Sequence, residues 1–309
     1  MRTTLSEAVS LLLSSHVVAV PTETVYGLAA CLNHPTAIEK IFALKKRPKS
    51  NPLIIHIANS NDLNRYVIEF PPGFEALAEK FWPGPLTCIL PVNTLIPSEA
   101  RAGLKTAGFR IPEHPLARRL LEETGPLVMP SANLSGKPSG TRPEHVEEDF
   151  GANFPVLDGG VCAKGLESTI LFFQNTQWVV VRLGALPPEA FCSVLGYVPD
   201  VVLKGQNQNP LCPGQLFRHY APRARLILGD RTRLEGISDV IGFKERIYPK
   251  DKRVFLLGSL LQPEEVAENL YAILRQIDDE EIEEVWVDMD FPRIGLWKTI
   301  AERLERAGE

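Results

Sequence analysis

The chain has 309 residues, of which 44% are hydrophobic and 23% are charged, a composition typical of soluble globular proteins with one or two domains. Its five cysteines form no C-x-x-C pair, which argues against a disulfide framework or a cysteine zinc site and predicts a cytoplasmic protein. Residues 1–224 carry 20 basic and 19 acidic side chains, whereas residues 225–309 carry 13 and 19. Because a strong basic excess is missing, we expect a small phosphate ligand rather than a wrapped nucleic acid.

The N-terminus is predicted to be a helix rather than a signal peptide. Apolar residues recur at helical spacing through residues 5–13, and Thr4 with Glu7 forms a capping-box pattern. Glu7 lies inside the apolar pattern and residues 14–16 interrupt it. No apolar run approaches the roughly 18 to 20 residues that cross a bilayer, so we expect no membrane partner.

Residues 17–57 are predicted to form a buried strand (17–20), a Thr-rich turn, a helix, a basic loop and a second buried strand (53–57). The turn PTETVYG (21–27) places hydroxyls, a carboxylate and a phenol after a strand, where α/β sheets commonly bind ligands. The loop KKRPKSN (45–51) places four cations beside two small polar side chains, a set suited to phosphate. Turn and loop are expected to open together at one end of a sheet. Alternatively, a threonine caps a helix and the cations only complement its dipole.

The middle of the chain alternates helices with short strands. A helix over residues 74–82 ends at a corner, WPGPLT, which we interpret as structural, and a strand follows over residues 86–92. The next strand contains Arg110, which needs an anionic partner from the protein or from a ligand, because an unpaired guanidinium is costly to bury.

A helix over residues 116–123 and a strand over residues 127–129 lead into the loop PSANLSG. Its small residues let backbone amides approach a ligand, although such loops usually have no special role. After a helix near residues 145–150, short apolar runs recur, and Arg182 emerges from a strand over residues 179–181.

Six motifs, PTETVYG, KKRPKSNPLIIH, WPGPLT, PSANLSG, ESTI and VRLG, occur in this order. The ordered set resembles the YrdC-like domain of threonylcarbamoyl-AMP synthases and extends over nearly all of residues 1–203. The resemblance implies a twisted mixed sheet with helices, and an enzyme that converts L-threonine, bicarbonate and ATP into threonylcarbamoyl-AMP and pyrophosphate. The product would feed a downstream threonylcarbamoyl transferase complex that modifies the adenosine next to the anticodon in certain tRNAs.

The resemblance also implies two pockets. The L-threonine pocket corresponds to Thr24, His56, Arg110, Ser131 and Ser168. The ATP pocket corresponds to Lys45, Arg47, Asn51, Thr106, Asn133, Thr141, Arg182 and Tyr220. Lys45, Arg47 and Arg182, with Mg²⁺ bound to ATP, would neutralise phosphate charge, so we expect catalysis by positioning and electrostatics. Metal ligands are not identifiable from the sequence, nor is a general base, for which Glu23 is a weak candidate.

Residues 204–224 are predicted to be a linker over the site. Within it, PLCPGQLFRHYAP resembles the PG…HYAP linker of the long, two-domain synthases, in which the residue matching Tyr220 lies near ATP; Gln215 and Leu216 depart from the usual pattern. Residues 225–309 are predicted to form a small Rossmann-like α/β domain with a parallel sheet. Its predicted strands are 226–228, 254–257 and 285–287, and its predicted helices are 264–276 and 296–307.

No catalytic set stands out in this second domain. Its acidic stretch at residues 278–284 is predicted to be solvated, and its expected role is to position the linker or bind a partner. Two alternatives stay open for the whole protein. One is a related carbamoyl-adenylate-forming enzyme, although the cysteine-rich zinc modules expected there are missing; the other is an RNA-binding or translation-associated module without catalysis.

Overall fold

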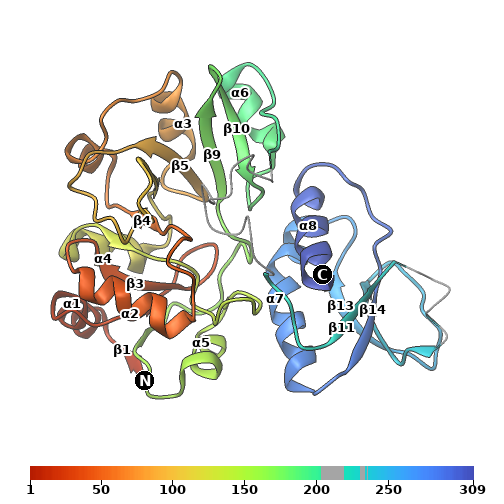
Figure 1. Ribbon diagram of the computed structural model, residues 1–309. Coiled ribbons are helices and arrows are strands. Elements are labelled where there is room, and N and C mark those ends of the chain that lie inside the picture. Colours follow the sequence, from red (N-terminus) through yellow and green to blue (C-terminus); the bar gives the residue numbers. More distant parts are fainter. Residues whose placement is uncertain (203–218, 230–233, 235) are drawn as a thin grey trace.

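The computed structural model describes residues 1–202, 219–229, 234 and 236–309 (Figure 1). It contains a ten-stranded mixed sheet and a separate four-stranded parallel sheet, which confirms the predicted fold class. We call the larger sheet with its helices the N-terminal unit, and the smaller sheet with its two helices the C-terminal unit. Among the described residues, no helix is both long and apolar enough to span a membrane.

The bounds of the N-terminal unit are as follows. Its strands are β1 (Arg2–Thr3), β2 (Val18–Val20), β3 (Gly27–Cys31), β4 (Ile54–His56), β5 (Leu86–Pro91), β6 (Thr106–Arg110), β7 (Leu127–Val128), β8 (Val156–Leu157), β9 (Thr169–Gln174) and β10 (Gln177–Arg182). Its helices are α1 (Leu5–Leu13), α2 (Pro35–Lys45), α3 (Phe74–Phe81), α4 (Pro115–Thr124), α5 (Pro143–Phe150) and α6 (Cys192–Leu195), with 3₁₀ turns η1 (Ser60–Arg65) and η2 (Pro188–Phe191). The spatial order is β1-β8-β2-β3-β7-β4-β6-β5-β9-β10.

Local signals account for most of these elements. The predicted capping box begins α1: the Glu7 amide donates to Thr4 Oγ1 at 3.3 Å, and the Thr4 amide donates to the Glu7 carboxylate at 2.8 Å. Helices α2, α4 and α5 each begin with proline in the first turn, a position where the missing N–H costs nothing.

Strand β3, which forms an antiparallel pair with β2, was not predicted from the sequence. All five of its residues, GLAAC, are buried. A strand covered on both faces shows no alternation of polar and apolar residues, and glycine and alanine have low strand propensity. The strand is identified only by its pairing with β2 and β7 in the folded sheet.

Strand register brings the site residues together. Strands β4 and β6 are parallel and pair His56 directly with Arg110. An isolated bridge pairs Gly27 with Ser131, and in the antiparallel pair β9 and β10, Arg182 lies opposite Ile170. Residues from distant parts of the sequence thus become neighbours on one sheet.

The C-terminal unit comprises β11 (Arg225–Leu228), β12 (Asp239–Phe243), β13 (Arg253–Gly258), α7 (Pro263–Asp279), β14 (Glu284–Val287) and α8 (Leu296–Gly308). The strand order is β11-β14-β12-β13 and every pairing is parallel. Strand β12 was not predicted. Helices α7 and α8 lie on the side of the small sheet that faces the N-terminal unit (Figure 1).

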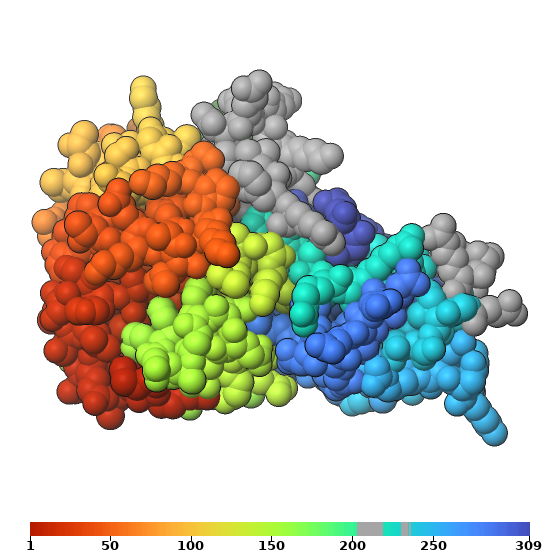
Figure 2. Space-filling view, turned by 60° about the horizontal axis from the view of Figure 1, so that its bottom comes forward, coloured from red at the N-terminus to blue at the C-terminus, as the bar shows by residue number. Residues whose placement is uncertain are grey.

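The two units meet through buried charges. In the space-filling view, the yellow-green surface of α5 meets the blue surface of the C-terminal unit (Figure 2). At this contact Arg275 of α7 donates to Asp149 of α5 at 2.8 Å and to the Pro138 carbonyl at 2.7 Å. The prediction that residues 278–284 are solvated is wrong for Asp278, which is 8% exposed and accepts a hydrogen bond from the Arg223 amide at 2.6 Å.

Candidate active site

A cavity with about 650 Å³ of free space, including its open mouth, lies on the N-terminal unit and is bounded on one side by the linker. Ile54 and His56, two residues apart on β4, both line it, so the cavity lies over a face of the sheet, whereas the sequence predicted one end of a sheet. Of the predicted site residues, those that line it are Thr24, Arg47, His56, Arg110, Ser131, Asn133, Ser168, Arg182 and Tyr220. Those that do not are Lys45, Asn51, Thr106 and Thr141.

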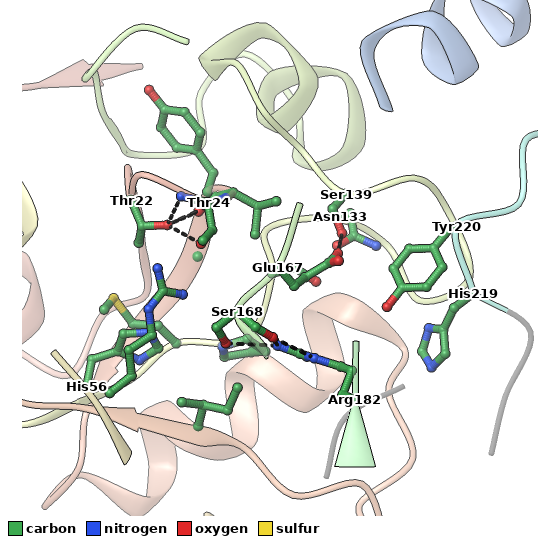
Figure 3. A pocket seen from close by; sticks show the side chains of 18 of the residues that line it. Thr22, Thr24, His56, Asn133, Ser139, Glu167, Ser168, Arg182, His219 and Tyr220 are labelled. Atoms are coloured by element: carbon green, nitrogen blue, oxygen red, sulfur yellow. Dashed lines mark hydrogen bonds between the residues drawn. The ribbon is translucent and has the colours of Figure 1, made fainter. Parts of the chain in front are cut away.

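The cavity has two distinct sides. Figure 3 shows Thr22, Thr24 and His56 on one side and His219 and Tyr220 on the other, with Ser168 and Arg182 between them. The arrangement suits an elongated ligand with different groups at its two ends.

Arg110 has the anionic partner that the sequence required, and it is a protein carboxylate. Its Nη2 donates to Glu23 Oε1 at 2.5 Å and its Nε donates to the Gly84 carbonyl at 3.2 Å. Glu23 also accepts the Glu113 amide at 3.0 Å, so this carboxylate serves to hold Arg110 in place. Arg110 Nη1 donates to none of the described residues and is available for a ligand carboxylate.

The threonines of the 21–27 turn bond to each other and to the local backbone. The Thr22 and Thr24 hydroxyls lie 2.7 Å apart, and the Val25 amide donates to Thr22 Oγ1 at 3.2 Å. These bonds fix the turn beside Arg110. Thr22 and Val25 are cavity residues that the predicted site did not include.

His56 lies next to Arg110 as a neutral imidazole. Burial, followed by the positive charges of Arg110 and Arg182, holds the pKa of His56 well below its usual range. Its Nδ1 is buried without a hydrogen-bond partner in the described part of the chain. Such an atom is costly to leave unpaired, so a polar ligand would gain a hydrogen bond there.

Four more buried polar atoms near the cavity or its walls lack partners among the described residues. They are Asn51 Oδ1, Asn133 Oδ1, Thr141 Oγ1 and His219 Nε2. Three of these residues belong to the predicted ATP pocket, and the fourth precedes Tyr220. Native proteins leave few such groups unsatisfied, and two of these four residues, Asn133 and His219, line the cavity, where a polar ligand could bond to them.

Lys45 has a different position from the one expected of a phosphate ligand. Its Nζ donates to the carbonyls of Ser131 at 2.5 Å and Asn133 at 2.6 Å, and the side chain is 1% exposed. Burial, with a contribution from Arg47, holds its pKa well below the usual range. Lys45 therefore ties the PSANLSG loop to α2 from behind the cavity.

The other cations are anchored by carbonyls. Arg47 Nε donates to the Asn51 carbonyl at 3.2 Å and Nη2 to the Pro52 carbonyl at 2.9 Å. Arg182 Nη2 donates to the Ser168 carbonyl at 2.7 Å and to Ser168 Oγ at 3.0 Å. Carbonyl oxygens carry no formal charge, so these particular bonds orient the two guanidinium groups at the cavity without neutralising them.

Two predicted residues lie away from the cavity lining. Thr106 begins β6 and Arg110 ends it, which separates them by about 13 Å along the strand. Thr141 is fully buried, and its amide donates to His145 Nδ1 at 3.2 Å.

Glu167 is a site residue that was not predicted. It is 6% exposed and accepts hydrogen bonds from Ser139 Oγ at 2.7 Å, the Tyr271 hydroxyl at 2.9 Å and Arg303 Nε at 3.1 Å. Burial alone would raise its pKa, but Arg303 and Arg182 more than offset that effect and lower it. The position of Glu167 in the ESTI motif could have indicated its role. No motif in the sequence pointed to its partners Tyr271 and Arg303.

The end of the linker reaches the cavity through His219 and Tyr220. Desolvation, with the charge of Arg47, lowers the pKa of His219 to about 3. Burial raises the pKa of Tyr220 to about 12, so the phenol stays protonated. Residues 204–218 of the predicted linker, which include Cys212 and the departures at Gln215 and Leu216, lie outside the described residues.

No group of three or more potential metal-ligating side chains occurs in the described ranges. The carboxylates of the site, Glu23 and Glu167, are already bound by arginines. The donor set therefore does not form a protein cage for Mg²⁺, and it fits only an ion that is held mainly by ligand phosphates.

Two family models together match most of the chain. Residues 10–184 match a family model described as "Telomere recombination", and residues 187–308 match one described as "Threonylcarbamoyl-AMP synthase, C-terminal domain". Threonylcarbamoyl-AMP synthase of Bacillus subtilis is 37% identical over 98% of this chain and 92% of its own length. The Pyrococcus abyssi enzyme of the same name is 39% identical over 94% of this chain and 90% of its own length.

A solved structure extends the likeness to three dimensions. The crystal structure of P. abyssi Sua5 complexed with L-threonine matches with a TM-score of 0.90 and 34% identity. The match covers 100% of this chain and 96% of that one. The relative's two-domain arrangement is therefore also that of this chain.

Proposed function

This chain belongs to the threonylcarbamoyl-AMP synthase family, and we propose that its cavity joins L-threonine, bicarbonate and ATP to give threonylcarbamoyl-AMP and pyrophosphate. The observation that supports this most directly is the pairing of Arg110 with His56 on adjacent strands, in one cavity with Arg47 and Arg182. In this proposal, a carboxylate site and a phosphate site share one cavity.

L-Threonine is proposed to bind beside Arg110. Its carboxylate would meet Arg110 Nη1, and its hydroxyl would bond His56 Nδ1, which has no partner in the described chain. A neutral histidine can donate to or accept from a hydroxyl, whereas an imidazolium can only donate. Thr24, Ser131 and Ser168 would orient the amine and the new carbamate.

ATP is proposed to bind toward Tyr220. Arg47 and Arg182 would face the phosphates, while Asn133 would offer its unpaired Oδ1 to the nucleotide. Lys45 would contribute by holding the Ser131–Asn133 backbone in place. Asn51, Thr106 and Thr141 remain predictions for this pocket that require a change in the described positions.

The chemistry requires no covalent enzyme intermediate. The threonine amine and bicarbonate would give an N-carboxy group, with loss of water. Its carboxylate then attacks the α-phosphorus of ATP, and pyrophosphate leaves as the P–O bond breaks. Arg47 and Arg182 would stabilise the charge that develops on the phosphates, and enclosure would protect the mixed anhydride from water.

We further propose that Mg²⁺ arrives with ATP. It would supply charge neutralisation at the phosphates, and the chain's role would be to bind and orient the complex.

The scattered cysteines, of which the four described are free, support the prediction of a cytoplasmic protein. The proposed product would pass to a threonylcarbamoyl transferase complex and reach tRNA indirectly. We propose that residues 1–203 form the catalytic domain, residues 204–224 the linker over the site and residues 225–309 the small C-terminal domain.

Pyrophosphate release tests the proposal. The purified protein would be given ATP and Mg²⁺ with and without bicarbonate and L-threonine, and with L-serine in place of threonine. We expect release only when threonine and bicarbonate are both present, and less with serine. Pyrophosphate release that depends on neither threonine nor bicarbonate would indicate an unrelated ATPase instead. No release, together with tRNA binding in the absence of ATP, would indicate a binding module.

A further inference from the structure

Arg303 of α8 is a fully buried arginine at the contact between the two units. Its Nε donates to Glu167 Oε2 at 3.1 Å and to the Tyr271 hydroxyl at 3.0 Å, and its Nη2 donates to the Leu183 carbonyl at 2.7 Å. Its Nη1 pairs with Glu302. Because a buried guanidinium needs all such partners, these contacts define one position for the side chain.

These contacts reach the two chain segments that carry Ser168 and Arg182, which lie between the two sides of the cavity (Figure 3). Glu167 directly precedes Ser168, and Leu183 directly follows Arg182. Ser168 and Arg182 are hydrogen bonded to each other. A single side chain of the C-terminal unit therefore fixes both segments that hold the Arg182 guanidinium.

Arg303 and Tyr271 also hold the ring of Tyr220. The Arg303 Cζ lies 4.6 Å from the Tyr220 ring centroid, and the Tyr271 ring stacks on Tyr220 with centroids 5.4 Å apart and planes 20° from parallel. Tyr220 is 6% exposed and has a φ of 65°, an uncommon conformation for a tyrosine. Figure 3 shows Tyr220 and His219 close to Arg182 and away from His56.

Neither Arg303 nor Tyr271 lines the cavity itself. We propose that Arg303 and Tyr271 are positioning residues for ATP: they hold Arg182 and Tyr220 in place, so that the C-terminal unit contributes more to nucleotide binding than to threonine binding. This inference rests on the proposed function, because it assigns the Tyr220 side of the cavity to ATP.

A second contact between the units provides a matched control. Lys298, also on α8, forms an ion pair with Glu189 at 2.6 Å, and both side chains are partly exposed. Neither residue lines the cavity. Lys298→Met therefore removes an interaction between the units without touching Arg182 or Tyr220.

The experiment compares Arg303→Lys, Tyr271→Leu and Lys298→Met with the parent protein. Lysine keeps the charge near Glu167 but lacks the planar fork that reaches Leu183 and covers the Tyr220 ring. Leucine at 271 removes the stacked ring and the hydroxyl. Calorimetry would measure the binding of α,β-methylene-ATP and of L-threonine separately, and thermal unfolding would check the fold.

We expect Arg303→Lys and Tyr271→Leu each to bind α,β-methylene-ATP about tenfold more weakly than the parent protein does. This is the size expected for losing a stacking or cation–π contact together with its hydrogen bonds. Threonine binding should stay within about twofold, and Lys298→Met should bind both ligands as the parent does. Equal weakening of both ligands, or unchanged nucleotide binding, would show that Arg303 only joins the units. If Arg303→Lys does not fold, Tyr271→Leu decides the question.

Failure of the proposed function gives a separate result. If the parent releases no pyrophosphate with threonine and bicarbonate but binds the ATP analogue, the synthase assignment fails while the positioning role is still measured by the same calorimetry. If the parent binds no ATP analogue at all, both fail together.

Discussion

Arg110 offers the most direct test of how the site binds its amino acid. Its guanidinium is 4% exposed and is held by Glu23 at 2.5 Å and the Gly84 carbonyl at 3.2 Å. Arg110→Lys preserves the positive charge beside Glu23. A lysine ammonium lacks the planar fork, so it cannot reach Glu23, the Gly84 carbonyl and a substrate carboxylate in the same geometry.

The magnitude follows from the contacts. Hydrogen bonds to charged groups contribute about 1.5–3 kcal/mol each, so losing one to the threonine carboxylate should weaken threonine binding roughly 10- to 150-fold. Arg110→Ala should do more, because it also leaves Glu23 buried without its counter-charge. We expect that variant to lose about 3–5 kcal/mol of unfolding free energy.

Calorimetric titration with L-threonine and urea unfolding would separate binding from stability. Arg101→Lys is the control, since Arg101 is half-buried and donates to the Ile96 carbonyl at 3.1 Å without lining the cavity. We expect the control to bind threonine as the parent does. Unchanged threonine binding in both Arg110 variants would refute the carboxylate role and with it the proposed orientation of the substrate.

Two further predictions concern residues that do not line the cavity. Burial, with the charges of Arg275 and Arg142, lowers the pKa of His145 to about 3, so only the unfolded chain takes up this proton as the pH falls below about 6.5. The protonation of this residue should therefore lower the unfolding free energy by about 2 kcal/mol between pH 7 and pH 5. Urea titrations at both pH values should show a smaller decrease in His145→Asn than in the parent protein. An equal decrease in the two proteins would contradict the lowered pKa of His145. Gly184→Ala should lower the unfolding free energy by about 1–3 kcal/mol or more, because a Cβ there would lie 2.4 Å from the backbone of Ser168. Gly236→Ala, where a Cβ meets no atom of the described residues within 4 Å, should unfold as the parent does. Similar unfolding free energies for the two variants would show that the backbone around Gly184 adjusts freely.

Much of this architecture was predictable from local sequence. The capping box of α1 and the apolar run of β4 depend on residues within a few positions of each other, so their patterns are visible in the chain itself. A buried arginine in a predicted strand was enough to require an anionic partner for Arg110. The resemblance then indicated the family and nine of the residues that line the cavity.

What the sequence could not indicate depends on contacts between distant residues. Strand β3 is hidden because burial on both faces removes the alternation that marks a strand. Lys45 is a cation in a basic loop, yet the fold turns it onto two backbone carbonyls 86 and 88 residues away. Arg303 and Glu167 are 136 residues apart, and only the docking of α8 brings this pair to the wall of the cavity. Such partners are set by the packing of whole elements, and no pattern along the chain encodes them.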